Sequence, residues 1–339
     1  MHMHVQRRVI RRLALGAVLV SMAVAHNPAS AVTIDWVTVG DPGNEADSTA
    51  YGDVADSFRI MKFEWTNAQY VDFLNAVDPN GTNPNSIYNS GMSNGRGGIS
   101  FASFNPAGSK YAARTNMGDK PVNFVSWFDA ARVANWLHNG QGTGSTETGA
   151  YTLGGATTGN AVAKNPGATF YIPTENEWYK AAYYKGSGTN AGYWDYATRS
   201  DTAPTAVTSG STGIGSAGST GNFANFNTVA DWNSQNGNVT TVGTNGGPSA
   251  YGTFDMSGNV FEWNDLTGSA GSSRGYRGGN WGAGANFLWS FGRVTNVPST
   301  ASNLIGFRLA AVPEPSTYCM GLAGLACGGY LVKQRRKRA

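Results

Sequence analysis

The sequence has very little cysteine and histidine. Its two cysteines, Cys319 and Cys327, lie near the C-terminus, and of its four histidines only His138 lies beyond the first 26 residues. The long middle part of the chain therefore offers no disulfide, no thiol nucleophile and no ligand set for a His/Cys zinc site. A Ser-His-Asp triad would need His138, which precedes Asn139 and Gly140 in a pattern typical of a helix C-terminus.

Charged residues are also few, at 13% of the chain, whereas glycine is abundant, with 46 residues. This balance favours a loop-rich exported protein over a helical cytosolic enzyme. Of the 24 basic residues, four precede residue 13 and five follow residue 332, and all 21 acids lie between them. The intervening chain thus has 15 basic and 21 acidic residues, a net charge of −6, which argues against a nucleic-acid partner despite the pI of 8.8.

Residues 1–31 have the three parts of a secretory signal peptide. A basic segment at 7–12 precedes an apolar run at 13–24 that is too short to span a bilayer, and Ala29, Ser30 and Ala31 form an Ala-x-Ala cleavage site. We expect export and a mature protein that begins at Val32. Cleavage after Ala25 is a second option, and a short buried helix is the alternative interpretation of the apolar run.

Residues 312–339 form a second sorting element. A Pro-Glu-Pro segment is followed by an apolar stretch at 318–332 and a basic tail at 333–338. The basic tail predicts a cytoplasmic end, and the short apolar stretch predicts a marginal, transient anchor in the inner membrane. This order resembles the PEP-CTERM sorting signal of Gram-negative bacteria. The resemblance implies recognition by an exosortase-type protease and a location at the cell surface or in the extracellular matrix.

The body of the chain, residues 32–311, predicts a single α+β domain with much irregular structure. N-cap signals at Thr66, Ser126 and Thr174 precede apolar residues with helical spacing. Strand candidates are short, at 58–63, 168–172, 275–277 and 307–311, and the Gly/Ser/Asn-rich segments 81–110 and 200–221 are predicted to be loops. The sequence contains no Walker loop, dinucleotide fingerprint or G-x-S-x-G elbow.

A family resemblance rests on five segments: MKFEWTNAQYVDFLN at 61–75, KPVNFVSWFDAARVANWL at 120–137, YIPTENEWYKAA at 171–182, YGTFDMSGNVFEWND at 251–265, and RGGNW at 277–281 with IGFRLA at 305–310. In this order and spacing they resemble the sulfatase-modifying-factor family, which includes the formylglycine-generating enzymes. The similarity covers about residues 37–310. It implies one compact domain of a modified C-type-lectin type.

The segment DMSGNVFEW places Asp255 and Glu262 in an otherwise apolar turn. Buried acids need cationic partners, and Ca²⁺ accepts carboxylates together with backbone carbonyls. The family resemblance implies a calcium site made by the side chains of Asp255 and Glu262 and the carbonyls of Gly258 and Val260. The alternative is that the two acids pair with Arg277 or Arg308, or cap local backbone.

A second calcium site is implied by the resemblance alone. It falls on Asn225, Phe226 and Asp231, in a region where the loop lengths differ from those of the family.

The segment RGGNWGAGANFLWSFGR, at 277–293, is where the family performs its chemistry. In the formylglycine-generating enzymes a pair of cysteines binds copper there. In this sequence the two positions fall on Ala283 and Leu288, and the neighbouring polar position falls on Asn280. Neither Ala nor Leu can ligate a metal, so we expect no copper. The iron-dependent relatives need a histidine cluster on a further domain, so we expect no iron either.

What remains in that segment suits binding. Aromatic side chains with a few polar groups are typical of ligand pockets and interface hot spots. The predicted pocket residues are Arg277, Asn280, Trp281, Phe287 and Trp289. Core packing is the alternative for the aromatic residues, which include Phe291, and we expect it for about half of them.

We therefore predict an exported, surface-associated, non-catalytic module that binds polysaccharide or a surface protein and holds structural calcium. A cysteine-independent enzyme of the same family is the alternative, with acid–base roles for Glu175, Glu177, Asp255, Glu262 or tyrosines. Formylglycine generation itself would require ligand atoms that this sequence lacks.

Overall fold

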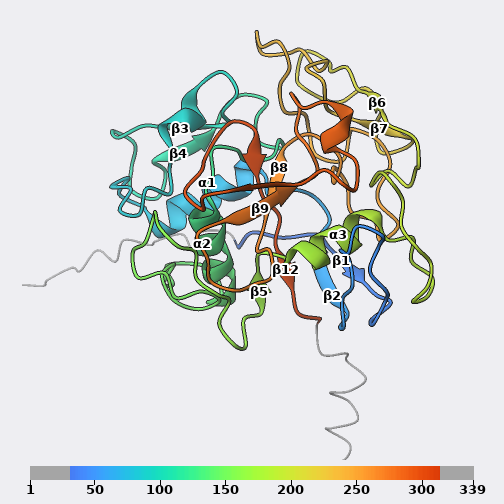
Figure 1. Cartoon of the computed structure of the whole chain (residues 1–339). Coiled ribbons are helices and arrows are strands. Elements are labelled where there is room, and N and C mark those ends of the chain that lie inside the picture. Colours follow the sequence, from blue (N-terminus) through green and yellow to red (C-terminus); the bar gives the residue numbers. More distant parts are fainter. Residues whose placement is uncertain (1–30, 314–339) are drawn as a thin grey trace, which may run out of the picture.

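A computed structural model describes residues 31–313 of the protein (Figure 1). Within this range the chain forms three α-helices and several small mixed sheets joined by long loops. The predicted α+β class, with few helices and much irregular structure, is confirmed. None of the helices in the described range is long and apolar enough to cross a membrane. The predicted signal peptide and the apolar stretch at 318–332 lie outside the described residues.

Each helix begins directly after its predicted N-cap. The helices are α1 (Asn67–Val77), α2 (Trp127–His138) and α3 (Glu175–Tyr183). At each start, the N-cap side chain accepts a hydrogen bond from the backbone three residues on, and the side chain at that position accepts one in return. These capping boxes satisfy backbone donors that a helix otherwise leaves open.

Four strands of the first sheet bring the two ends of the domain together. Its order is β1-β2-β12-β5, with β1 (Trp36–Val39), β2 (Phe58–Met61), β12 (Ala310–Ala311) and β5 (Phe170–Tyr171). The last strand, β12, lies between β2 and β5 and is antiparallel to both. The end of the domain is thereby fixed against its beginning.

The second sheet lies at the centre of the molecule (Figure 1) and has the order β10-β9-β8-β11. Its strands are β10 (Val294–Asn296), β9 (Arg274–Arg277), β8 (Phe261–Asn264) and β11 (Ile305–Gly306). The chain leaves this sheet after β11 and enters the first sheet at β12. The predicted strand at 307–311 is therefore reduced to two residues, because the chain passes between the sheets there.

Two segments predicted to be loops contain regular structure. Residues 81–110 include the 3₁₀ turn η1 (Ser90–Ser93) and β3 (Ile99–Phe101), which pairs with β4 (Tyr111–Ala113). Residues 200–221 include β6 (Thr205–Ala206), which pairs in parallel with β7 (Phe223–Ala224). A further turn, η2 (Ala285–Phe287), follows β9. These strands were missed because pairing with a distant partner, rather than local periodicity, defines them.

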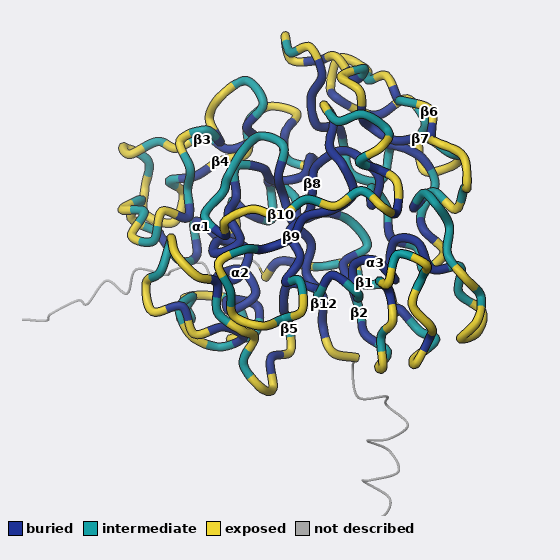
Figure 2. The backbone as a smooth tube through the Cα atoms, in the orientation of Figure 1, coloured by how far each residue is buried: buried dark blue, intermediate teal, exposed yellow. Residues whose placement is uncertain are grey.

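The core is unusually rich in aromatic side chains. Five tryptophans are fully buried: Trp65, Trp127, Trp136, Trp178 and Trp263. Figure 2 shows the buried backbone gathered at the centre and the exposed loops around it. Large rings fill space that longer strands would occupy in other domains, so a fold with little regular structure still has a continuous core.

Candidate functional site

The segment 277–293 starts at the end of β9 and is fixed there by Arg277. This side chain is buried; its Nε donates to Glu175 Oε1 of α3 at 2.7 Å, and its Nη1 donates to the carbonyls of Ser290 and Gly292 at 3.0 Å. Gly279 follows with φ +77°, and a Cβ on it would lie 2.5 Å from Leu288 Cδ1. Arg277 was predicted to line a pocket. Its hydrogen bonds instead connect the start of the segment to Ser290 and Gly292 near its end.

Ala283 and Leu288, the two positions predicted from the sequence to correspond to copper ligands, have different surroundings. Ala283 is half-buried, whereas Leu288 is completely buried and packs with Ala224 and Phe226. Asn280 is also buried, and its Oδ1 accepts a hydrogen bond from Gly282 N at 2.8 Å. Leu288 is thus part of a small apolar cluster.

The four aromatic residues of the segment separate into two pairs. Trp281 is buried, with Nε1 donating to Asn303 O at 3.1 Å and the Arg96 guanidinium 4.6 Å from its ring. Phe287 is half-buried and meets Phe261 edge to face. In contrast, Trp289 and Phe291 are 38% and 56% exposed, with ring centroids 4.6 Å apart. Only the second pair faces solvent and is free to contact a ligand.

A buried group of carboxylates surrounds the DMSGNVFEW turn. Both oxygens of Glu262 accept hydrogen bonds from Arg308 at 2.6 Å, and Trp178 Nε1 donates to Glu262 Oε2 at 2.7 Å. Asp255 accepts from Gly243 N at 2.6 Å and from Asn245 Nδ2 at 2.9 Å. These are the contacts expected under the alternative to calcium, in which an arginine and local backbone satisfy the acids.

Glu64 lies in the same group and was not identified from the sequence. Its Oε1 accepts from Val260 N at 3.2 Å and its Oε2 from Asn259 Nδ2 at 2.8 Å. Burial raises the pKa of Glu64 well above its usual value, and the nearby charges of Asp255 and Glu262 raise it further. Burial likewise raises the pKa of Asp255. Arg308 is thus the one arginine near the three acids Glu64, Asp255 and Glu262. A bound cation or protonation would offset the excess negative charge.

The second predicted calcium site contains an unsatisfied oxygen. Asn225 is fully buried and donates through Nδ2 to Asn238 O, Thr240 Oγ1 and Asn259 Oδ1, but its Oδ1 has no hydrogen-bond partner. A buried amide oxygen without a partner suits a cation ligand.

The other two predicted ligands of this site are nearby in the chain. Phe226 is buried, and Asp231 is exposed, with its Oδ1 accepting from Gly237 N at 2.6 Å. The donor set is chemically suitable for calcium.

Within residues 31–313, no group of three or more His, Cys, Asp or Glu side chains could hold a metal. The predicted calcium sites depend largely on amide and carbonyl oxygens, which do not belong to such a group. Calcium therefore stays a prediction at both places.

The acids considered for acid–base chemistry are engaged in structural contacts. Glu175 is shared between Arg277 and Arg293, both with Nε 2.7 Å from its Oε1. Glu177 forms the capping box of α3 and accepts from Tyr171 OH at 2.8 Å.

At the end of α2, His138 Nδ1 lies 2.8 Å from Thr169 Oγ1. Its predicted place at a helix end is confirmed.

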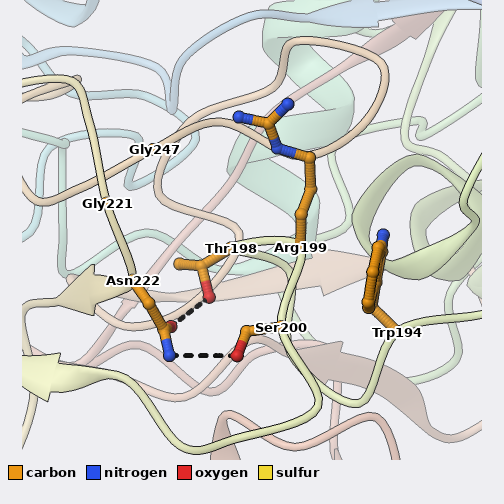
Figure 3. A pocket seen from close by; sticks show the side chains of 7 residues that line it. All are labelled: Trp194, Thr198, Arg199, Ser200, Gly221, Asn222 and Gly247. Atoms are coloured by element: carbon orange, nitrogen blue, oxygen red, sulfur yellow. Dashed lines mark hydrogen bonds between the residues drawn. The ribbon is translucent and has the colours of Figure 1, made fainter.

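An open pocket of about 480 Å³ lies near the segment 277–293. It is at the side of the molecule that carries β6 and β7 (Figures 1 and 3). Its walls come from three loops and contain Trp194, Thr198, Arg199, Ser200, Gly221, Asn222 and Gly247. Trp194 stands on one side and Asn222 on the other, with Arg199 extending between them (Figure 3). We call it the Trp194 pocket.

None of the pocket's residues was predicted to lie at a site. The available signal was the run GYWDYATRS at 192–200, which concentrates aromatic residues and an arginine just ahead of a Gly/Ser-rich segment. Only the fold shows that this run lies next to 288–291: Tyr196 forms a bridge with Trp289, and Ser290 N donates to Asp195 O at 2.9 Å.

The small mixed sheets, the aromatic core and the glycine-rich segment after β9 together define a formylglycine-generating-enzyme-like domain. A family model described as the sulfatase-modifying factor enzyme 1-like domain matches residues 36–312. The chain belongs to this family. Membership by itself assigns no activity, although the family takes its name from an enzyme.

The chain is similar to several solved structures at low sequence identity. Treponema denticola variable protein 1 matches with a TM-score of 0.51 and 20% identity, over 84% of this chain and 97% of that chain. CarF matches with a TM-score of 0.49 and 22% identity, over 83% and 99%. PvdO from Pseudomonas aeruginosa matches with 0.40 and 20%, over 83% and 92%. The comparison with curated proteins gives no match.

Proposed function

We propose that the protein is an exported, non-catalytic binding module of the formylglycine-generating-enzyme type, directed to polysaccharide or protein at the cell surface. The observation that carries this proposal is the packing at Leu288. Leu288, at a position predicted to correspond to a copper ligand, has no ligand atoms and is completely buried against Ala224 and Phe226. The same segment presents Trp289 and Phe291 to solvent.

The contacts of the acids count against the alternative of a cysteine-independent enzyme. A general acid or base must reach its substrate. Glu175, Glu177 and Glu262 are buried, and each is held by an arginine, a helix N-terminus or a tyrosine. Their arrangement supports the fold and leaves none of these three carboxylates open to solvent.

Calcium, export and anchoring belong to the same proposal. Asn225, Phe226 and Asp231 would hold one calcium ion through amide, carbonyl and carboxylate oxygens, and such an ion would stabilise the long loop at 225–238. The signal peptide predicted at 1–31 and the sorting element predicted at 312–339 support export, processing by an exosortase-type protease and transient attachment to the inner membrane.

The test uses the full-length chain purified in mild detergent. In one arm, a Cys-x-Pro-x-Arg peptide is incubated with the protein, oxygen and copper; we expect no aldehyde, and aldehyde formation would contradict the non-catalytic proposal. In the second arm, the protein is applied to a panel of polysaccharides and cell-surface proteins. We expect saturable binding to at least one of them, and no binding to any would overturn the proposed function.

A further inference from the structure

The Trp194 pocket has a flat aromatic wall. The Trp194 indole lines the cavity, and Lys185 Nζ lies 4.3 Å from its ring centroid. The indole Nε1 makes no hydrogen bond with any described residue, so a donor as well as a ring face is open to a ligand. Indoles present a large, rigid contact surface at low entropic cost.

Polar groups on the opposite side form a connected row. Thr198 Oγ1 donates to Asn222 Oδ1 at 2.6 Å, and Asn222 Nδ2 donates to Ser200 Oγ at 3.1 Å (Figure 3). The two loops that carry them are thereby held together before any ligand arrives. Thr202 also bonds to Ser200 Oγ and to Asn222 Nδ2, so the free acceptors on this side are Thr198 Oγ1 and the second lone pair of Asn222 Oδ1. Pre-organised acceptors beside an aromatic wall suit a ligand with one apolar face and many hydroxyl groups.

Arg199 has a backbone conformation that is unfavourable for its residue type. Its φ is +60°, in the left-handed region, which costs a residue with a Cβ about 1–2 kcal/mol. Its side chain is exposed and makes no hydrogen bond or ion pair with any described residue. Arg199 is the last residue of the turn that closes the bridge between Tyr196 and Ser200, so the positive φ serves this turn and the guanidinium is left for other contacts.

An inner cavity adjoins the pocket. It shares Thr198 and Gly247 with the Trp194 pocket and has room for about one water molecule, with a volume of about 10 Å³. Ser257 lines it, is 4% exposed, and has an Oγ without a hydrogen-bond partner. A buried hydroxyl without a partner at the back of an open pocket is a position where a ligand hydroxyl or its water is stabilised.

The charges near the pocket are balanced. Lys185 and Arg199 are cationic, and Asp195 and Asp201 lie on the same segment as Arg199, with Asp201 Oδ1 accepting from Asp195 N at 3.1 Å. A site of this kind binds by stacking and hydrogen bonds and has no strong attraction for a polyanion.

A second aromatic pair lies close in the structure. The bridge between Tyr196 and Trp289 places the exposed pair Trp289 and Phe291 beside the segment that carries Trp194. Further exposed aromatic rings next to the pocket segment suit a ligand with repeating rings.

We propose that the Trp194 pocket, extended by Trp289 and Phe291, binds consecutive pyranose rings of an uncharged polysaccharide. The apolar face of one ring stacks on Trp194, and the ring hydroxyls accept from the Arg199 guanidinium and donate to Asn222 Oδ1 and Thr198 Oγ1, which keep free lone pairs. This inference deepens the proposed binding function and rests on it. A protein ligand and an anionic polysaccharide are the two competing outcomes.

The test measures binding of the full-length chain in mild detergent to immobilised oligosaccharides, with β-1,4-glucan and β-1,4-N-acetylglucosamine as uncharged probes and alginate and hyaluronan as anionic ones. Two variants probe the pocket. Trp194→Ala removes the stacking wall, and Arg199→Gly removes the guanidinium while relieving the positive φ, so it does not weaken the fold. Phe104→Ala is the control, because Phe104 is 89% exposed on the β3–β4 hairpin, away from the pocket (Figure 1).

We expect wild type and Phe104→Ala to bind an uncharged probe equally. Trp194→Ala should raise the Kd at least 10-fold and Arg199→Gly at least 3-fold, the latter with an unchanged or higher Tm. Uncharged-glycan binding that survives both substitutions would refute the pocket and leave the proposed function intact. Binding only to anionic probes, or only to surface proteins, would refute the ligand class, and binding to nothing would refute the proposed function as well.

Discussion

Leu288 shows how one side chain changes what the segment after β9 can do. A cysteine pair in this region would need space for a metal ion and access for a substrate. Leu288 instead lies in a cluster with Ala224 and Phe226, and Tyr196 packs against that cluster. The loop that carries Tyr196 forms the Trp194 pocket on its outer side. The same packing thus buries Leu288 and positions the loop that forms the pocket.

Replacing Leu288 with alanine tests this packing. We expect Leu288→Ala to reduce the free energy of unfolding by about 2–4 kcal/mol, because it leaves a cavity among buried apolar groups. Phe104→Ala, at a fully solvated ring, should change it by less than about 0.5 kcal/mol. Chemical denaturation of the two variants measures both values, and equal stabilities would show that Leu288 has no core role.

At the scale of elements, α3 is connected to the rest of the domain by buried charge. Glu175, its first residue, receives Arg277 from β9 and Arg293 from the start of β10. Arg277 also stacks over Tyr51 and Tyr179 at 4.6 and 5.0 Å from their centroids. A single carboxylate at a helix N-terminus therefore fixes the helix to both arms of the segment that carries the candidate site.

The ion pairs of Arg277 and Arg293 with Glu175 should contribute different amounts to the free energy of unfolding. Glu175→Gln leaves the buried Arg277 without a counter-charge, so we expect a loss of about 3–5 kcal/mol. Arg293→Gln should cost less than about 1 kcal/mol, because the Arg293 side chain is 36% exposed and Glu175 keeps Arg277. Urea denaturation measures both losses of stability. A larger loss for Arg293→Gln than for Glu175→Gln would contradict this prediction.

At the scale of the whole molecule, loops make up most of the described structure, so we expect bound ions and buried acids to contribute to its stability. Calcium at 225–231 would fix the long segment between β7 and β8 that contributes to the core through Phe226 and Trp232. Buried acids act on the same scale, because their protonation changes with folding.

Calcium addition should raise the Tm of the protein after treatment with a chelator. Saturation at about 100 times Kd corresponds to about 2.7 kcal/mol. Asp231→Asn should abolish the rise if the ion lies at Asn225 and Asp231, and Asp255→Asn should do so if it lies in the DMSGNVFEW turn. Elemental analysis without calcium, together with a Tm that calcium leaves unchanged, would remove both predicted sites.

The stability of the domain should fall as pH rises through weak acid. Burial raises the pKa of Asp129 and of Asp265 from 3.8 to about 6. Their contribution is complete below pH 3.8 and is lost as pH rises through about 6, because the folded state binds the proton more tightly than the unfolded state.

Replacing either acid isolates its contribution. We expect Asp129→Asn or Asp265→Asn to reduce the stability difference between pH 4 and pH 7 by about 1–3 kcal/mol. Asp56→Asn, at an exposed acid, should leave the difference unchanged. Thermal denaturation of each variant at a series of pH values measures how its stability depends on pH. The same dependence in all variants would contradict the raised pKa values.

The sequence by itself determined the family, the α+β class, the three helix starts and the lack of cysteine in residues 32–311. Each of these depends on local information: capping residues act within one turn, and a missing cysteine is missing in any fold. The tertiary structure decided which aromatic residues face solvent, and it joined Glu262 to Arg308, 46 residues apart. It also brought Tyr196 to Trp289 and so revealed the Trp194 pocket. Burial and pairing between distant segments depend on long-range packing, which no local pattern in the chain encodes.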